Sequence, residues 1–140
     1  MKYNISTIKL SLIRDSEPLG NIQNPTDAAE IAQLYIGDAD REHLIVLLLD
    51  VKHNVTGLHT VSIGHLSAAL IHPREVFKAA ILGNAAAIIV AHNHPSGNLS
   101  PSEADKATTE RLVKAGELLD IPVLDHIVVG AATANRSRGN

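Results

Sequence analysis

The sequence contains no cysteine and no tryptophan, and its few aromatic residues are Tyr3, Tyr35 and Phe77. Without cysteine the chain forms no disulfide bond and performs no thiol chemistry, which fits a reducing cytoplasm. With so few aromatic rings, the core must be built from Leu, Ile, Val and Ala. A length of 140 residues, 45% of them hydrophobic, is enough for one compact domain and short for two.

The sequence also lacks an excess of basic residues and long apolar runs. Its net charge is −3 and its pI is about 6.2, so it offers no broad nucleic-acid-binding face. No run approaches the ~20 apolar residues of a membrane span, and the first residues lack the apolar core of a signal peptide. We therefore expect a cytoplasmic domain without a membrane partner, for which direct contact with nucleic acid is not expected.

Apolar patterns and turn residues predict an alternation of strands and helices. Strands are expected over residues 5–13 (an edge strand), 44–49, 55–63, 85–91 and 122–130, and helices over 25–36, 73–82 and 101–119. Residues 20–24 are expected to form a turn, and 131–140 a frayed polar tail. This order predicts a single-domain α/β sandwich around a mixed β-sheet, with an N-terminal strand and turn over 1–24, the domain proper over 25–130 and the tail over 131–140.

Two histidines follow the most apolar run of the chain, at positions 92 and 94. Side chains two residues apart on a strand share a face, so His92 and His94 point the same way if the extended geometry continues. Asn93 then points away from them. Two imidazoles on one face, joined by a carboxylate from elsewhere, are suited to zinc.

The carboxylate is expected from a helix that begins shortly afterwards. Ser100 is the predicted N-cap, Pro101 the first helical residue and Glu103 the partner in a capping box. Ser102 and Asp105 then lie on one side of the first turns, reached through a tight Gly97–Asn98 loop. The same side continues as the inward apolar stripe, with Thr108, Leu112, Ala115 and Leu119. Aspartate is unusual in such a stripe but normal as a metal ligand.

Three protein ligands and one open position are the layout of a catalytic zinc site, and hydrolysis there needs a general base. Glu42 precedes the buried strand 44–49 and is expected at the rim of the sheet. The pattern alone leaves open whether Glu42 is a base or a solvated charge. The other candidates are weaker: Glu30 and Glu75 lie on predicted helices, and Glu103 is assigned to capping.

The run from His92 to Asp105, HNHPSGNLSPSEAD, resembles the JAMM motif of MPN+/JAB metalloproteases and, within them, the RadC-like group. Residues 73–77 (PREVF) and 125–130 (DHIVVG) are similar to its flanking segments, and the likeness spans about residues 25–130. The resemblance implies an MPN/JAB-type fold related to cytidine deaminases. Relatives usually carry an N-terminal helix-hairpin-helix segment, for which this chain is expected to have no room. Their C-terminal motif is only faintly echoed by Ser137 and Arg138.

Carried over by position, the resemblance implies Zn²⁺ held by His92, His94 and Asp105, with water as the fourth ligand. Glu42 would be the general base and acid, and Ser102 would bind the water or the developing oxyanion. The implied activity is zinc-dependent hydrolysis of peptide or isopeptide bonds in a peptide or protein substrate. The natural substrate and the oligomeric state stay open, and the family's link to DNA repair gives no mechanism.

Two other classes of function stay open, a metal-dependent nuclease and a non-catalytic interaction module. The letters His-Asn-His suggest a metal-dependent nuclease, but HNH nucleases spread these residues over a longer unit. A non-catalytic interaction module would not need the complete ligand set. His126 is interpreted either as a residue that orients a ligand imidazole or, preferably, as a structural residue. Arg74 is interpreted as a ligand of a substrate carboxylate or as a cap of the sheet edge. The remaining histidines are interpreted as surface or strand-end residues: His43, His53, His59, His65 and His72.

Overall fold

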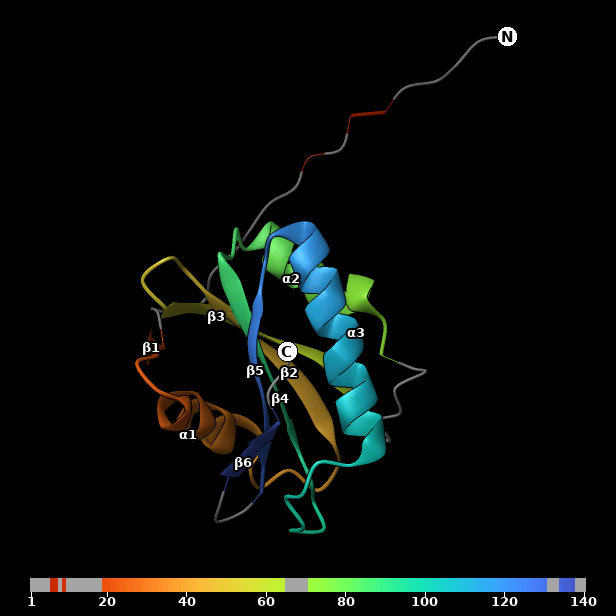
Figure 1. Ribbon diagram of the computed structural model, residues 1–140. Coiled ribbons are helices and arrows are strands. Elements are labelled where there is room, and N and C mark those ends of the chain that lie inside the picture. The colour runs from red at the N-terminus through yellow and green to blue at the C-terminus, as the bar shows by residue number, and fades with distance from the viewer. Residues whose placement is uncertain (1–5, 8, 10–18, 65–70, 131–133, 138–140) are drawn as a thin grey trace, which may run out of the picture.

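The computed structural model describes residues 6, 7, 9, 19–64, 71–130 and 134–137, the last four by their backbone alone. Within these residues, a six-stranded sheet lies between three helices (Figure 1). The elements are β1 (Gly20–Asn21), α1 (Pro25–Ile36), β2 (His43–Leu49), β3 (Asn54–Ile63), α2 (Pro73–Leu82), β4 (Ala87–Asn93), α3 (Glu103–Leu119), β5 (Val123–Val129) and β6 (Ala134–Ser137). The predicted single α/β domain with a mixed sheet between helices is confirmed.

The strand order is β1-β3-β2-β4-β5-β6. All neighbouring pairs are antiparallel except β4 and β5, which run parallel and are connected through α3. In a parallel pair both carboxyl ends lie at the same edge of the sheet, and the loop after β4 leads there directly to the start of α3. This crossover brings the residues after β4 and the first turn of α3 to one place.

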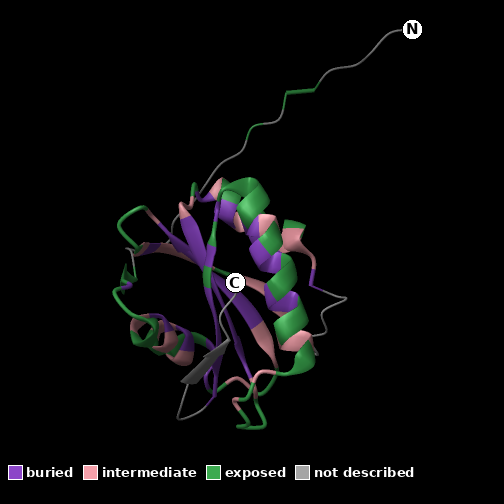
Figure 2. Cartoon of the chain, in the orientation of Figure 1, coloured by how far each residue is buried: buried purple, intermediate pink, exposed green. Residues whose placement is uncertain are grey.

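The central strands are buried on both faces, which explains their continuous apolar runs (Figure 2). One face packs against α1 through Ile45, Leu47 and Ile89. The other packs against α2 and α3 through Leu44, Val46, Ile88 and Val90, with Phe77 among the buried side chains of α2. Since side chains alternate along β4, His92 continues the face covered by α3.

The two edge strands were not expected. The predicted turn over residues 20–24 is wrong in part, because Gly20 and Asn21 pair with Val55 and Asn54 of β3. The tail is not frayed throughout, because residues 134–137 pair antiparallel with β5. Both short strands are held by backbone pairing and carry no alternating apolar pattern. The strand predicted over residues 5–13 falls largely outside the described residues.

The buried faces of the helices differ from the prediction at their carboxyl ends. Leu119, expected to face inward, is 43% exposed, and Ile81 near the carboxyl end of α2 is 55% exposed. In α3 the inward stripe instead includes Val113 and Gly116. A Cβ at Gly116 would lie 2.5 Å from the Ile121 carbonyl oxygen, so this glycine lets the last turn pack closely and leaves Leu119 at the surface. None of the described helices has both the length and the apolar character needed to cross a membrane.

Candidate metal centre

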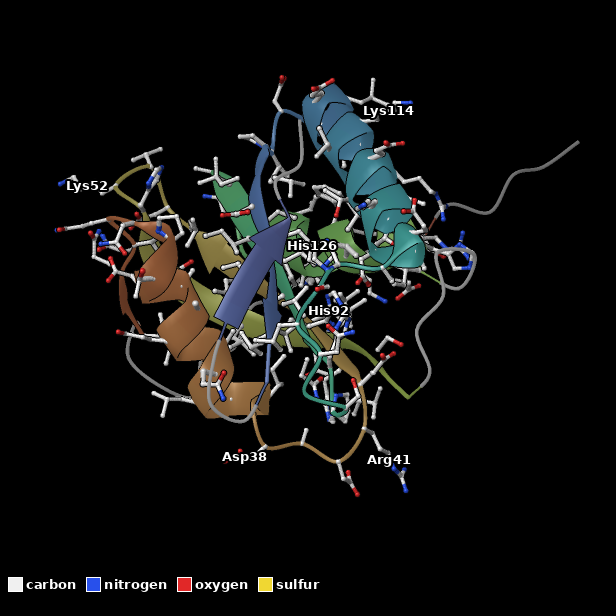
Figure 3. The ribbon with its side chains drawn as sticks, turned by 60° about the horizontal axis from the view of Figure 1, so that its bottom comes forward. Asp38, Arg41, Lys52, His92, Lys114 and His126 are labelled. Atoms are coloured by element: carbon white, nitrogen blue, oxygen red, sulfur yellow. The ribbon has the colours of Figure 1, made fainter. Side chains whose placement is uncertain are left out.

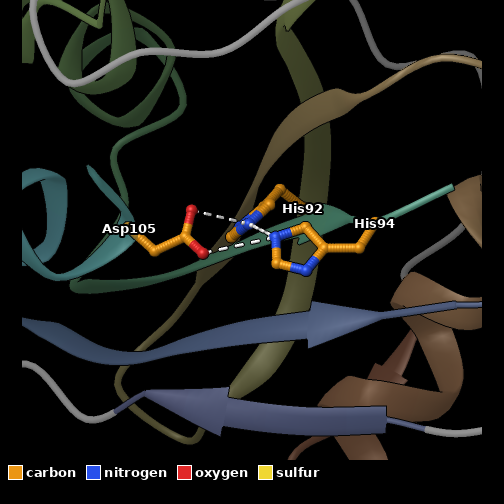
Figure 4. Close-up of side chains that lie close together, drawn as sticks. All are labelled: His92, His94 and Asp105. Atoms are coloured by element: carbon orange, nitrogen blue, oxygen red, sulfur yellow. Dashed lines mark hydrogen bonds and ion pairs between the residues drawn. The ribbon is translucent and has the colours of Figure 1, made fainter. Parts of the chain in front are cut away.

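Three predicted ligand side chains converge at the carboxyl end of β4 (Figure 4). The Nε2 atoms of His92 and His94 lie 2.9 Å apart. Asp105, from the first turn of α3, places Oδ1 3.0 Å from Nε2 of His92 and Oδ2 3.2 Å from Nε2 of His94. The two imidazoles therefore share a side, as the strand spacing predicts.

The residues fit a metal ion in both geometry and donor type. Ligand atoms about 2.0–2.1 Å from a tetrahedral zinc lie roughly 3.3 Å from one another. The separations of 2.9–3.2 Å among His92, His94 and Asp105 are close to that value. Two imidazole nitrogens and one carboxylate oxygen also leave a fourth position open, as catalytic zinc sites do. The side chains of His92, His94 and Asp105, called the metal group below, could hold a metal ion.

Asp105 is positioned by the start of α3, which begins two residues later than predicted. The N-cap is Ser102, not Ser100, and Pro101 precedes the helix. Ser102 Oγ accepts from the Asp105 backbone N–H at 3.0 Å, and Asp105 Oδ2 accepts from the Ser102 N–H at 2.7 Å. The sequence holds two overlapping capping boxes, and the one whose acid also faces His92 is formed. Capping thus fixes the carboxylate at the metal group.

The surroundings of Asp105 keep its carboxylate ionised. Burial alone would raise its pKa, but the contacts with His92 and the N–H of Ser102 outweigh burial and hold the pKa of Asp105 well below its usual range. Its place in the first turn of α3 adds the favourable field of the helix N-terminus. An ionised carboxylate is the form that binds a cation.

His94 is oriented by the loop that follows β4. Its Nδ1 lies 2.6 Å from the Asn98 carbonyl oxygen, which can only accept, so Nδ1 carries the proton. The lone pair of Nε2 then points to the metal group. The loop reverses at Gly97, whose φ of 83° suits glycine and whose N–H donates to the His94 carbonyl. The tight Gly97–Asn98 reversal expected from the sequence is present.

His92 is oriented by another imidazole, that of His126 on β5 (Figure 3). Nδ1 of His92 lies 2.7 Å from Nε2 of His126, and Nδ1 of His126 lies 2.5 Å from Thr109 Oγ1. Burial, together with the nearby His92, lowers the pKa of His126 to about 3, so this ring is neutral at ordinary pH. His126 thus contacts a candidate ligand directly. Thr109, one helical turn after Asp105, was missed by the sequence analysis.

Glu42 lies directly before β2 and is partly buried. Leu44 pairs with His92 in the antiparallel register of β2 and β4, so continuing that register brings Glu42 opposite His94. Opposite residues of an antiparallel pair share a face, which is the face of the metal group. The Glu42 carbonyl accepts from the Gly64 N–H at 2.8 Å, which holds its backbone beside β3.

Asn93 acts on the other side of the same strand. Its fully buried amide accepts from the His43 N–H at 2.6 Å and donates to the carbonyls of Arg41 at 2.9 Å and Ala39 at 3.4 Å. These groups flank Glu42, so Asn93 fixes the segment that carries it. Strand alternation turns Asn93 away from the histidines, but its structural role was not foreseen. An asparagine between two ligand positions in a buried strand was the only available signal.

The other residues considered are not part of the metal group formed by the described residues. His43 contacts the Arg41 carbonyl through Nδ1, and Arg74 lies at the surface beside Glu75. His65 lies outside the described residues. Within the part of the chain that is described, the group that could hold a metal ion contains both histidines singled out in the sequence.

The comparisons with known proteins identify the family. The model described as RadC-like JAB domain matches residues 22–138. A UPF0758 protein of Rubrobacter xylanophilus is 47% identical over 109 residues, which are 78% of this chain and 48% of that protein. A UPF0758 protein of Desulforamulus reducens is 45% identical over 120 residues, which are 84% of this chain and 53% of that protein. UPF0758 protein SH1266 of Staphylococcus haemolyticus is 49% identical over 117 residues, which are 84% of this chain and 51% of that protein. The chain spans about half the length of these relatives. The resemblance seen in the sequence is thereby confirmed, and the chain belongs to the RadC-like JAB domain family.

Proposed function

We propose that this domain is a zinc-dependent hydrolase of peptide or isopeptide bonds, a metallopeptidase of the JAMM type that acts on a peptide or protein in the cytoplasm. The observation that carries the proposal is the convergence of His92, His94 and Asp105 at 2.9–3.2 Å beside the segment of Glu42. A structural zinc site usually has four protein ligands, whereas the described residues supply three here and leave one position open.

The three ligand residues would hold the ion from one buried and two more open positions. His92 is 2% exposed, whereas the side chains of His94 and Asp105 are each 13% exposed. A bound zinc ion would supply a Lewis acid that lowers the pKa of water and polarises a carbonyl group. Since the buried side is closed by His92, the substrate would approach from the side of His94 and Asp105.

Glu42 would transfer the proton of the reaction. As general base it takes a proton from the attacking water, and as general acid it gives that proton to the leaving amine. The register supports this role, since Glu42 follows the same face as His92 and His94. Ser102 uses an oxygen lone pair for the Asp105 N–H, which leaves its O–H hydrogen to donate to the oxyanion of the attacked carbonyl.

The nuclease interpretation gains no support from the tripeptide. The amide of Asn93 is used by backbone groups of residues 39–43 on the side away from the histidines. It therefore has no free group to contribute to an HNH-type site.

The proposal is tested by zinc stoichiometry and by turnover of fluorogenic peptide and isopeptide-linked lysine libraries with the zinc-loaded protein. We expect one zinc per chain, turnover, and a loss of about 10²–10⁴-fold in kcat for Glu42→Gln with zinc still bound. Glu30→Gln, an exposed carboxylate on α1, is the matched control and should leave turnover unchanged. One zinc per chain without turnover of any library would overturn the proposal in favour of an interaction module. Absence of zinc binding would likewise overturn the proposal.

A further inference from the structure

We propose that Thr109, His126 and His92 form a hydrogen-bonded relay in which His126 is a positioning residue that fixes the tautomer of His92. The inference rests on the metal-binding part of the proposed function and does not depend on the reaction catalysed. It concerns two residues outside the ligand set, His126 and Thr109, and no motif singled out Thr109.

The relay consists of three consecutive contacts inside the protein. The Thr109 hydroxyl donates to the Asp105 carbonyl oxygen at 2.8 Å. Nδ1 of His126 lies 2.5 Å from Thr109 Oγ1, and Nε2 of His126 lies 2.7 Å from Nδ1 of His92. His92, Thr109 and His126 are 1–3% exposed, so water cannot replace any of these partners.

The number of hydrogens then assigns every donor. A hydroxyl has one hydrogen, and Thr109 gives it to the carbonyl of Asp105. Thr109 Oγ1 must therefore accept from the Nδ1–H of His126. In the zinc-loaded site Nε2 of His92 would hold the ion, so the one proton of that ring is on Nδ1 and is donated to Nε2 of His126. The Nε2 atom of His92, which faces His94 and Asp105, then keeps its lone pair for the bound ion.

The relay also joins two ligands that belong to different elements. Thr109 lies one turn after Asp105 on α3, and its hydroxyl contacts the backbone of that same ligand. His126 lies on β5, beside β4 that carries His92. The orientation of His92 is therefore tied to the position of α3. His94 has a simpler anchor, the carbonyl of Asn98 in the surface loop.

The first test reads the tautomers directly in the zinc-loaded wild-type domain by long-range ¹H–¹⁵N correlation of the imidazole rings. We expect His126 as the neutral Nδ1–H tautomer, and His92 with a proton on Nδ1 and none on Nε2. An Nε2–H tautomer or a doubly protonated ring at His126 would reverse the direction of donation and overturn the proposal.

The second test measures zinc affinity by competition with a chromogenic chelator. Thr109→Val keeps the shape but removes the hydroxyl, and we expect it to weaken zinc binding about 10–100-fold. Thr109→Ser restores the hydroxyl and should return affinity to within about threefold of wild type. Thr108→Val, a buried neighbour on the same helix outside the relay, is the matched control.

Equal zinc affinity of Thr109→Val and wild type would overturn the relay, as would equal weakening by Thr108→Val. Thermal unfolding of each zinc-free variant shows that it is folded before its affinity is compared. Since the readouts are tautomer and affinity, absence of peptidase turnover would overturn the proposed function and leave the relay standing.

Discussion

Asp105 has two tasks, and two substitutions separate them. Its Oδ2 accepts from the N–H of Ser102 in the capping box, and both carboxylate oxygens face the imidazoles of the metal group. Asp105→Asn keeps one oxygen for the capping contact but removes the charge. Asp105→Ala removes both. We expect the first variant to lose zinc affinity with little change in zinc-free stability, and the second to lose both.

The magnitudes follow from these contacts. Without zinc, Asp105→Ala should cost about 1 kcal/mol of unfolding free energy for the lost cap, and Asp105→Asn clearly less. Zinc at a hundred times its Kd stabilises the wild type by about 2.7 kcal/mol, or roughly 10 °C in a domain of this size. If Asp105→Asn weakens affinity about a hundredfold, the same zinc concentration gives only about 0.4 kcal/mol, or 1–2 °C.

The assay is thermal unfolding with and without zinc at fixed pH. Asp27→Asn is the matched control, because Asp27 holds the same capping-box position in α1, away from the metal group. It should keep the full zinc shift. If zinc raised the midpoint of Asp105→Asn as much as that of wild type, Asp105 would not be a ligand. If zinc-free Asp105→Asn were as unstable as Asp105→Ala, the capping argument would be wrong.

Three further predictions concern the segment of Glu42, the pH dependence of stability and the packing of α3. Asn93→Ala should raise the rate of amide hydrogen exchange at His43 more than tenfold, because the His43 N–H loses its acceptor. An unchanged rate would contradict the role of Asn93 in fixing the segment around Glu42. The zinc-free domain should lose stability as the pH falls from about 6.5 towards 3, by at most ~1.4 kcal/mol per pH unit. The reason is that unfolded His126 takes up a proton in that range and folded His126, with a pKa of about 3, does not. For His126→Gln, the unfolding free energy measured by urea unfolding should fall less steeply with decreasing pH than that of wild type. An equal pH dependence of the two proteins would refute the assignment of this effect to His126. Gly116→Ala should lower the unfolding free energy by about 1–3 kcal/mol, because the new Cβ would lie 2.5 Å from the backbone oxygen of Ile121. Inside a helix, a change from glycine to alanine usually raises stability instead. Urea unfolding measures this loss, with exposed Ala107→Gly on the same helix as reference, and a stabilised Gly116→Ala would disprove the close packing.

The central strands and the histidine pair could be predicted because their signals are local. A run such as 44–49 is apolar at every position because both faces of β2 are covered, and the spacing of His92 and His94 follows from strand alternation alone. The start of α3 was misplaced by two residues for a local reason as well. Ser100 with Glu103 matches the usual Ser-x-x-Glu capping-box pattern, but the box that forms is Ser102 with Asp105, whose carboxylate also contacts the imidazoles.

The supports of the site could not be predicted, since each one joins distant parts of the chain. His126 is 34 residues from His92, and Asn93 is 50 residues from His43. Neither separation belongs to a periodic pattern, so only the pairing of β4 with its neighbours reveals the contacts. The edge strands escaped for another reason: β1 and β6 pair through backbone groups, which every residue except proline offers.

The tripeptide at residues 92–94 ties these observations together, because its three side chains depend on one strand register. Leu44 opposite His92 puts both histidines on the face of α3 and turns the Asn93 amide towards the backbone around Glu42. A slip of one residue between β2 and β4 would exchange the two faces, bringing Asn93 to the metal group and turning both imidazoles away. The buried apolar residues of β2 and β4 therefore do more than stabilise the sheet. By specifying that register, they hold the ligands and the segment of the proposed base in place relative to one another.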